Sequence, residues 1–213
     1  MNNVFVWMAS WDEKFDSQKE PLIHTLPIHL QKEILKFKYS ADQNQALMSK
    51  LLVNRMLKMW GYDFTDLHYI QNQKPYIHHP DTPPFFSYSK SIGKVVLVWS
   101  WEIDVGIDIE YLHRNTDWKI FQSRLSSSVW NQIIHDENPS FCFIWSWTHI
   151  EAIIKLKAIG LADHIKLVEY KEKQWYFENE KIYTQCIIHE NHVITLASHE
   201  PFHFEIEKVS FEV

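Results

Sequence analysis

Residues 102–110 read Glu-Ile-Asp-Val-Gly-Ile-Asp-Ile-Glu, with apolar side chains at odd positions and carboxylates or Gly106 at even ones. An alternation of period two predicts a β-strand that buries its apolar face and presents four acids on the other. Asp108 and Glu110 then project side by side, about 7 Å apart along the strand. The alternative for this segment alone is an exposed acidic face that pairs with neighbouring lysines.

Two carboxylates this close repel each other, and each raises the pKa of the other unless a cation or a shared proton compensates. Carboxylate oxygens without nearby cysteines or an ordered pair of histidines favour Mg²⁺, Mn²⁺ or Ca²⁺ over zinc. The strand thus indicates a site for a hard divalent cation. This interpretation needs support from a second segment of the sequence.

Residues 144–155 supply that second segment, Ile-Trp-Ser-Trp-Thr-His-Ile-Glu-Ala-Ile-Ile-Lys. On a helix, Trp147, Glu151 and Ile154 share one stripe that is otherwise apolar. A carboxylate buried on such a stripe has to be paired or bound to a metal. Lys155 follows Glu151 at a spacing of four, and a surface ion pair is the alternative interpretation of these two residues.

Outside these two segments, the hydrophobic periodicity predicts an α+β chain. The first half has a strand at 4–9, helices at 28–37 and 41–60, and a hairpin over 85–101 that turns near Gly93. The second half repeats this order loosely, with a strand at 102–110, helices at 116–134 and 141–158, and strands from 165 onward. We therefore expect two similar α+β halves, residues 1–101 and 102–213.

The scarcity of glycine excludes several enzyme classes. The chain has only 4 glycines, and no two of them are close in sequence. Dinucleotide-binding fingerprints, phosphate-binding P-loops and G-x-S-x-G nucleophile elbows all need clustered glycines for tight turns and close backbone approach. None of these three sites fits this sequence.

The charge and the cysteine content limit the classes of partner and the cellular compartment that fit this sequence. A formal net charge of −6 argues against non-specific binding to nucleic acid. The 2 cysteines form no C-x-x-C pair, and no apolar run approaches the roughly 20 residues that cross a bilayer. Because the N-terminus does not have the pattern of a signal peptide, we expect a cytoplasmic protein. We also expect it to be a monomer and to bind neither nucleic acid nor membrane.

Four segments together resemble the Sfp-type phosphopantetheinyl transferases. Residues 106–110 match that family's G-[IV]-D-[IV]-E pattern, and residues 147–155 match its W-[ST]-x-K-E-[AS]-x-x-K pattern at Trp, Glu and Lys. Upstream, residues 73–75 (Gln-Lys-Pro) resemble its G-K-P loop, and residues 86–91 resemble its F-N-x-S-H-S segment. The resemblance in order and spacing covers residues 27–161.

The resemblance implies a magnesium-dependent transferase of the holo-acyl-carrier-protein synthase type, with Mn²⁺ as the other candidate ion. It would transfer 4′-phosphopantetheine from coenzyme A to a serine of an acyl or peptidyl carrier protein and release 3′,5′-ADP. The family fold consists of two similar α+β halves related by a pseudo-twofold axis, with the coenzyme between them. That fold agrees with the loose repeat in the sequence.

Carried over by position, the metal ligands of the family fall on Asp108, Glu110 and Glu151. Glu151, or a water on the metal, would accept the proton of the carrier serine. Lys155 would face the phosphates, so Glu151 and Lys155 are the expected catalytic residues.

The same correspondence assigns coenzyme binding to Lys74, Pro75, Ser89 and Lys90. Lys74 would contact the adenosine phosphate end, and Ser89 and Lys90 would line the same pocket. The carrier protein would dock on apolar residues of the second half, at 121–130.

The sequence departs from the family pattern at three places. Ile150 replaces the lysine of the K-E pair, Lys90 replaces the histidine of S-H-S, and Asn44-Gln45 stands where the family has His-Arg. Two of these changes remove phosphate-binding cations, so a second hypothesis is a homologue that binds coenzyme A or a carrier protein without turnover. A divalent-metal phosphohydrolase that uses the same acids is a third.

Overall fold

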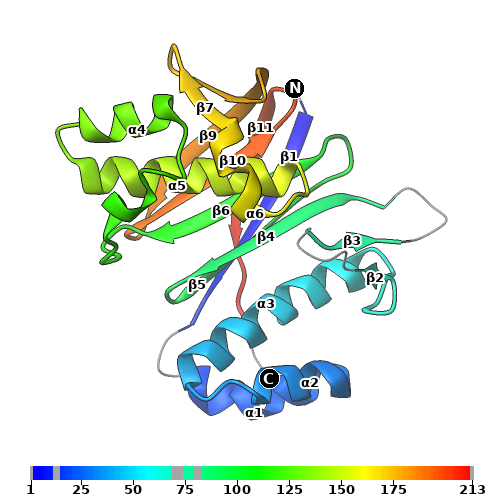
Figure 1. The fold of residues 1–213 in the computed structure, drawn as a ribbon. Coiled ribbons are helices and arrows are strands. Elements are labelled where there is room, and N and C mark those ends of the chain that lie inside the picture. The colour runs from blue at the N-terminus through cyan, green and yellow to red at the C-terminus, as the bar shows by residue number, and fades with distance from the viewer. Residues whose placement is uncertain (1, 12–14, 69–73, 79–82, 212–213) are drawn as a thin grey trace.

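The computed structural model describes residues 2–11, 15–68, 74–78 and 83–211. Strands and helices are mixed along the chain (Figure 1), which confirms the α+β class. The strands are β1 (Asn2–Ser10), β2 (Leu67–His68), β3 (Tyr76–Ile77), β4 (Phe85–Ser91), β5 (Lys94–Ser100), β6 (Val105–Tyr111), β7 (Val168–Lys171), β8 (Gln174–Phe177), β9 (Glu180–His189), β10 (His192–Ser198) and β11 (Phe202–Lys208). The helices are α1 (Phe15–His24), α2 (Ile28–Leu35), α3 (Ser40–Met59), α4 (Ser127–Ile134), α5 (Pro139–Leu156) and α6 (Leu161–His164), with 3₁₀ turns η1 (Trp118–Phe121) and η2 (Ile165–Leu167). No helix in the described residues is both long and apolar enough to cross a membrane.

Two sheets contain most of the strands. The first has the order β11-β1-β5-β4, the second has the order β6-β10-β9-β8-β7, and β2 and β3 form a separate ribbon. β11 runs parallel to β1, with Asn2 opposite Phe202, whereas the other neighbouring strands are antiparallel. The chain changes sheet between β5 and β6, at the predicted boundary after residue 101, but β11 returns from the second half to the first sheet.

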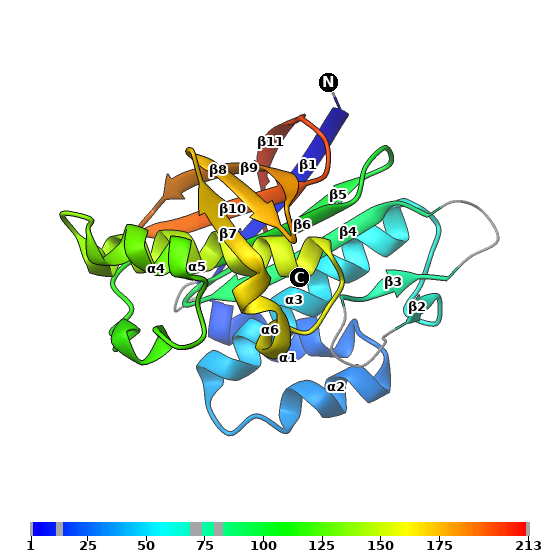
Figure 2. The same cartoon turned by 45° about the horizontal axis from the view of Figure 1, so that its top comes forward.

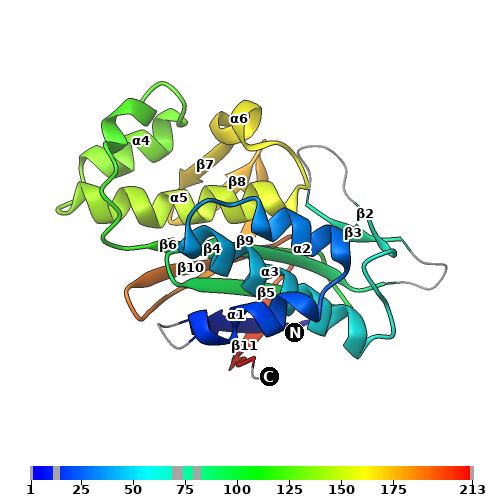
Figure 3. The ribbon, with the colours of Figure 1, turned by 90° about the horizontal axis from the view of Figure 1, so that it is seen from below.

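Each large sheet is covered by one long helix. α3 packs on the first sheet and α5 on the second (Figure 1), and α1 and α2 lie beside α3 (Figures 2 and 3). The other faces of the two sheets meet in a third buried cluster, to which Val6 and Val98 contribute from the first sheet and Ile107 and Ile194 from the second. Strand alternation produces this division, since Trp7, next to Val6, belongs to the cluster under α3.

α5 lies very close to β6 at Gly106. A Cβ atom at Gly106 would overlap the backbone carbonyl oxygen of Ala152 and would come within 2.6 Å of the backbone nitrogen of Leu156. Glycine, which has no Cβ, allows this approach of two backbones. The glycine of the acidic segment therefore sets the distance between α5 and β6.

The predicted hairpin and the two long helices are confirmed close to their expected bounds. β4 and β5 turn at Gly93, whose φ of +73° is the left-handed conformation that glycine adopts freely. The single helix predicted over 116–134 is wrong, because η1 and α4 are separate. A new helix, α4, begins after the N-cap residue Ser126, whose side chain accepts a hydrogen bond from the Val129 amide. α1, which contains Pro21, was not predicted.

Candidate metal centre

The acidic strand begins later than predicted. β6 starts only after Asp104, so Glu102 and Asp104 lie in the turn that precedes it. The Ser100 hydroxyl accepts hydrogen bonds from two backbone amides of this turn, at 3.2 and 3.5 Å, which keeps the turn out of the sheet. The prediction of four acids on one strand face is therefore wrong, and β6 carries only Asp108 and Glu110.

β6 and α5 bring three carboxylates together. Asp108 and Glu110 project from the α5 side of β6, Glu151 projects from α5, and one oxygen of each lies within 4.8 Å of the other two. The side chains of Asp108, Glu110 and Glu151 are only 3%, 13% and 21% exposed, respectively. The alternative of a solvated acidic face is therefore wrong, and the Glu151–Lys155 pair, 3.6 Å apart, is not a surface ion pair.

Asp108 is the most buried of the three acids. Its Oδ1 accepts hydrogen bonds from Ser89 Oγ and from Lys155 Nζ, both at 2.7 Å, and Lys155 Nζ also donates to Ser89 Oγ at 2.8 Å. Its Oδ2 is buried and has no hydrogen-bond partner among the described residues. Because an unpartnered buried carboxylate oxygen is costly, this atom is a strong candidate ligand for a cation.

Burial and mutual repulsion favour protonation of two of these acids. Burial, and then the charge of Asp108, raises the pKa of Glu151 to about 7. The same two causes raise the pKa of Glu110 to about 6, against the opposing effect of Arg114, which donates to Glu110 Oε1 at 2.6 Å. Burial acts to lower the pKa of Lys155, but the carboxylates of Asp108 and Glu151 outweigh it and raise that pKa. Additional positive charge would therefore stabilise the ionised acids.

The donor set fits a hard divalent cation. Its ligand atoms are carboxylate oxygens, which suit Mg²⁺ and Mn²⁺ and are a poorer match for softer metals. The unpartnered Oδ2 of Asp108 offers a coordination position that no other described side chain fills. Asp108, Glu110 and Glu151 are the residues that would hold the ion.

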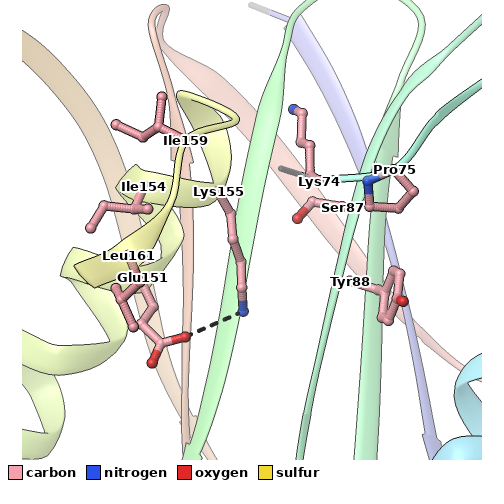
Figure 4. A pocket seen from close by; sticks show the side chains of 9 residues that line it. All are labelled: Lys74, Pro75, Ser87, Tyr88, Glu151, Ile154, Lys155, Ile159 and Leu161. Atoms are coloured by element: carbon pink, nitrogen blue, oxygen red, sulfur yellow. Dashed lines mark ion pairs between the residues drawn. The ribbon is translucent and has the colours of Figure 1, made fainter. Parts of the chain in front are cut away.

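A pocket of about 320 Å³ opens beside these acids (Figure 4). One wall comes from α5 and the segment that follows it, and the opposite wall comes from β4 and the segment before β3. The lining residues are Lys74, Pro75, Ser87, Tyr88, Glu151, Ile154, Lys155, Ile159 and Leu161. Lys74 pairs with Asp104 and donates to the carbonyl of Val105 at 3.2 Å. Burial lowers the pKa of Lys74, and Asp104 partly offsets this shift.

The residues predicted to bind the coenzyme divide into two groups. Lys74 and Pro75 line the pocket, and Ser89 contacts both Asp108 and Lys155. Lys90, the next residue on β4, points to the other face. It is exposed, and its charged neighbours Lys50 and Asp42 are on α3. The structure therefore does not bring Lys90 and Ser89 into one pocket, and Gln73 of the predicted loop lies outside the described residues.

The departures from the family pattern have structural roles here. Ile150 has 0% exposure and belongs to the core under α5, so position 150 points away from the acids. Asn44 donates to Asp16 at 2.9 Å, and Gln45 donates to the carbonyl of Ser91 at 3.2 Å. These amides connect α3 to α1 and β4.

The docking surface expected at residues 121–130 is largely absent. Leu125 and Val129 are buried in the core of the second sheet, with 5% and 0% exposure. The exposed apolar side chains in this part of the chain are Ile120 and Ile134, which lie outside the expected segment.

Sequence reasoning missed part of the site. Ser87, Ser89 and Ser91 occupy every second position of β4 and so share one face of the strand. This row of small hydroxyl side chains was the available signal that this face of β4 packs closely against another strand. Ser91 Oγ accepts a hydrogen bond from the Tyr111 amide at 3.0 Å, which joins β4 to β6. Arg114 was also missed, because a spacing of four indicates an ion pair only on a helix, whereas Glu110 lies in β6 and Arg114 lies after the strand ends.

Comparison with known proteins does not identify a family for this chain. No protein-family model matches it, and no curated protein matches its sequence.

Proposed function

We propose that the protein transfers 4′-phosphopantetheine from coenzyme A to a serine of an acyl or peptidyl carrier protein, with Mg²⁺ or Mn²⁺ held by Asp108, Glu110 and Glu151. The observation that carries the proposal is the convergence of these three carboxylates, from two separate segments, to within 4.8 Å. The same acids carry the sequence resemblance to phosphopantetheinyl transferases. The pair of helix-covered sheets agrees with the two similar halves of that family.

The chemistry requires charge neutralisation next to a pyrophosphate. A divalent ion on the three acids would stabilise the negative charge of the phosphates. Lys74 and Lys155 line the adjoining pocket, and their ammonium groups would hold the phosphates in position. Phosphoryl transfer depends mainly on such positioning and electrostatic stabilisation.

Glu151 is the group that would accept the proton of the carrier serine. Without a metal, burial and Asp108 raise its pKa to about 7. A cation bound by the three acids would lower this pKa and keep the carboxylate ionised at neutral pH, as a base has to be. As the bond between the serine oxygen and phosphorus forms, the bond from phosphorus to the leaving oxygen breaks. The departing 3′,5′-ADP keeps that electron pair, and the carrier retains phosphopantetheine as a phosphodiester.

The test combines the protein with coenzyme A, Mg²⁺ and a panel of apo carrier proteins, and follows the intact mass of each carrier. We expect a gain of one phosphopantetheine group on a single serine, which EDTA abolishes. Absence of a gain on every carrier, with folded protein and free Mg²⁺ present, would reject the transferase.

A homologue that binds coenzyme A without turnover is the second candidate. It is favoured by Asn44 and Gln45, which offer no positive charge where the family has a histidine and an arginine. Calorimetry that detects coenzyme A binding, together with no mass gain on any carrier, would support this candidate.

A further inference from the structure

Lys155 occupies the centre of the acid cluster. Its Nζ lies 2.7 Å from Asp108 Oδ1, 2.8 Å from Ser89 Oγ and 3.6 Å from an oxygen of Glu151. This ammonium group therefore contacts two of the three acids whose oxygens converge within 4.8 Å. It supplies one positive charge to a cluster that carries up to three negative ones.

A divalent cation on the same acids would face this ammonium group at short range. Two positive charges that share buried carboxylates repel strongly, because little water separates them. Oδ1 of Asp108 already has two donors, whereas Oδ2 is buried without a partner. Asp108 thus has all its hydrogen-bond donors on the Oδ1 side, where Lys155 lies, and none at Oδ2.

We propose that Lys155 is an exchangeable counter-ion, whose ammonium group neutralises the acids while they lack a metal and leaves them when a divalent cation binds. The inference rests on the proposed function only in taking a divalent cation as the ligand of the acids. A lysine suits this role because its flexible stem and three rotatable donors impose no fixed geometry. Lys155 also lines the pocket of about 320 Å³, which gives its ammonium group room to move toward a phosphate-bearing substrate.

The neighbouring cations are placed differently. Lys74 is paired with Asp104, which is not one of the three acids. Arg114 contacts one oxygen of Glu110 from the rim, and its side chain is 51% exposed. Solvent screens an exposed pair of this kind, so Arg114 should compete with a metal much less than Lys155 does.

The test compares metal binding by the unchanged protein, Lys155→Met and Arg114→Met. Methionine keeps most of the lysine stem and removes the charge. Calorimetry and electron paramagnetic resonance with Mn²⁺ measure the affinity without any substrate. We expect Lys155→Met to bind Mn²⁺ about tenfold more tightly, or better, and Arg114→Met to change the affinity by less than about threefold.

A second measurement uses the unchanged protein, so it does not depend on a variant folding. Hydrogen bonds to Asp108 and Ser89 protect the Lys155 ammonium protons, which NMR of the lysine side chains can detect. We expect Mg²⁺ to shift or abolish this signal while the Lys74 signal stays in place. A Lys155 signal that remains unchanged at saturating Mg²⁺ would overturn the exchange.

The outcomes separate this inference from the proposed function. Equal or weaker Mn²⁺ binding by folded Lys155→Met, with clear binding by the unchanged protein, would overturn the counter-ion and leave the metal site standing. No binding by either protein would overturn both. Should Lys155→Met fail to fold, Lys155→Gln provides the same comparison with a polar side chain.

Discussion

α3 and α5 cover their sheets in the same way, yet they use their polar residues differently. On α3, Gln45 donates to the carbonyl of Ser91 at 3.2 Å, and Ser49 donates to that of Gln45 at 2.7 Å. These groups are neutral and bond to backbone. On α5, Glu151 is itself one of three clustered carboxylates, and Lys155 contacts this cluster. The burial of three neighbouring negative charges is unfavourable. Polar groups on α3 therefore serve packing, whereas those on α5 keep an unfavourable arrangement of the kind found at functional sites.

The largest effect is expected from Asp108→Asn, which keeps the volume of the side chain and removes the charge from the centre of the site. We expect Mn²⁺ affinity and the rate of phosphopantetheine transfer to fall by about a hundredfold or more. Glu102→Gln is the matched control, since Glu102 lies in the turn before β6 and outside the cluster. Equal losses in the two variants would mean that net charge, and not the cluster on α5 and β6, controls binding.

Ile150→Lys tests whether position 150 of α5 faces the core, as Ile150 does, or the site that contains Glu151. Because Ile150 is fully buried, an unpaired lysine there should lower the free energy of unfolding by about 3 kcal/mol or more. Ile150→Val, the control, should cost about 1 kcal/mol. Urea unfolding measures both. A stable Ile150→Lys protein with tighter coenzyme A binding would show that position 150 reaches the phosphates after all.

The close contact between α5 and β6 is tested by Gly106→Ala. The added methyl group meets backbone atoms of Ala152 and Leu156, so α5 has to shift, at a cost of about 2–3 kcal/mol. Gly93→Ala, in the β4–β5 turn, has open space around the new Cβ and costs about 1 kcal/mol through its positive φ alone. Mn²⁺ affinity should fall only in Gly106→Ala, because that shift moves Glu151.

The stability of the metal-free protein is expected to depend on pH. The pKa of Glu151 rises from an ordinary 4.5 to about 7 on folding, so the native state binds more protons than the unfolded state between these values. The free energy of unfolding contributed by Glu151 is therefore fully present below pH 4.5 and is lost as the pH rises to about 7. Glu151→Gln should remove this loss, which is on the order of 3 kcal/mol for a pKa that changes from 4.5 to about 7.

The measurement is the difference between the urea stabilities of the two proteins at several pH values. A difference is needed because burial lowers the pKa of His149 to about 4, which makes stability rise with pH over part of the same range. Parallel curves for the two proteins would contradict the raised pKa of Glu151. Saturating Mg²⁺ should reverse the sign of the Glu151 contribution, since the metal binds the ionised form.

Local patterns were sufficient to predict the acids. Asp108 and Glu110 follow the period of a strand, and Glu151 interrupts an apolar stripe of a helix, so each could be recognised within a few neighbouring residues. Lys90 was a different case. Alternation along β4 already places it opposite Ser89, but the family correspondence, which lacks that directional information, assigned both to one pocket.

Contacts between distant segments could not be predicted in this way. The pairing of Lys74 with Asp104, and the hydrogen bond from Ser89 to Asp108, depend on how β4 lies against β6. Periodicity reports which face of an element is buried and does not report which element covers it. The same limit applies to β11, which was not predicted as a strand and whose place in the first sheet depends on pairing with the distant β1.

The parallel pairing of β11 with β1 has a consequence for how the chain folds as it is synthesised. Asn2 and Phe202 are neighbours in the sheet but are made nearly the whole length of the chain apart. β5 can cover one edge of β1 early in synthesis, whereas the other edge stays open until β11 has been made. Contacts of such long sequence separation slow folding and prolong exposure to aggregation. Cleavage after residue 101 would separate β11, on the second fragment, from its partner β1 on the first. The two fragments should therefore regain their structure only when they are refolded together.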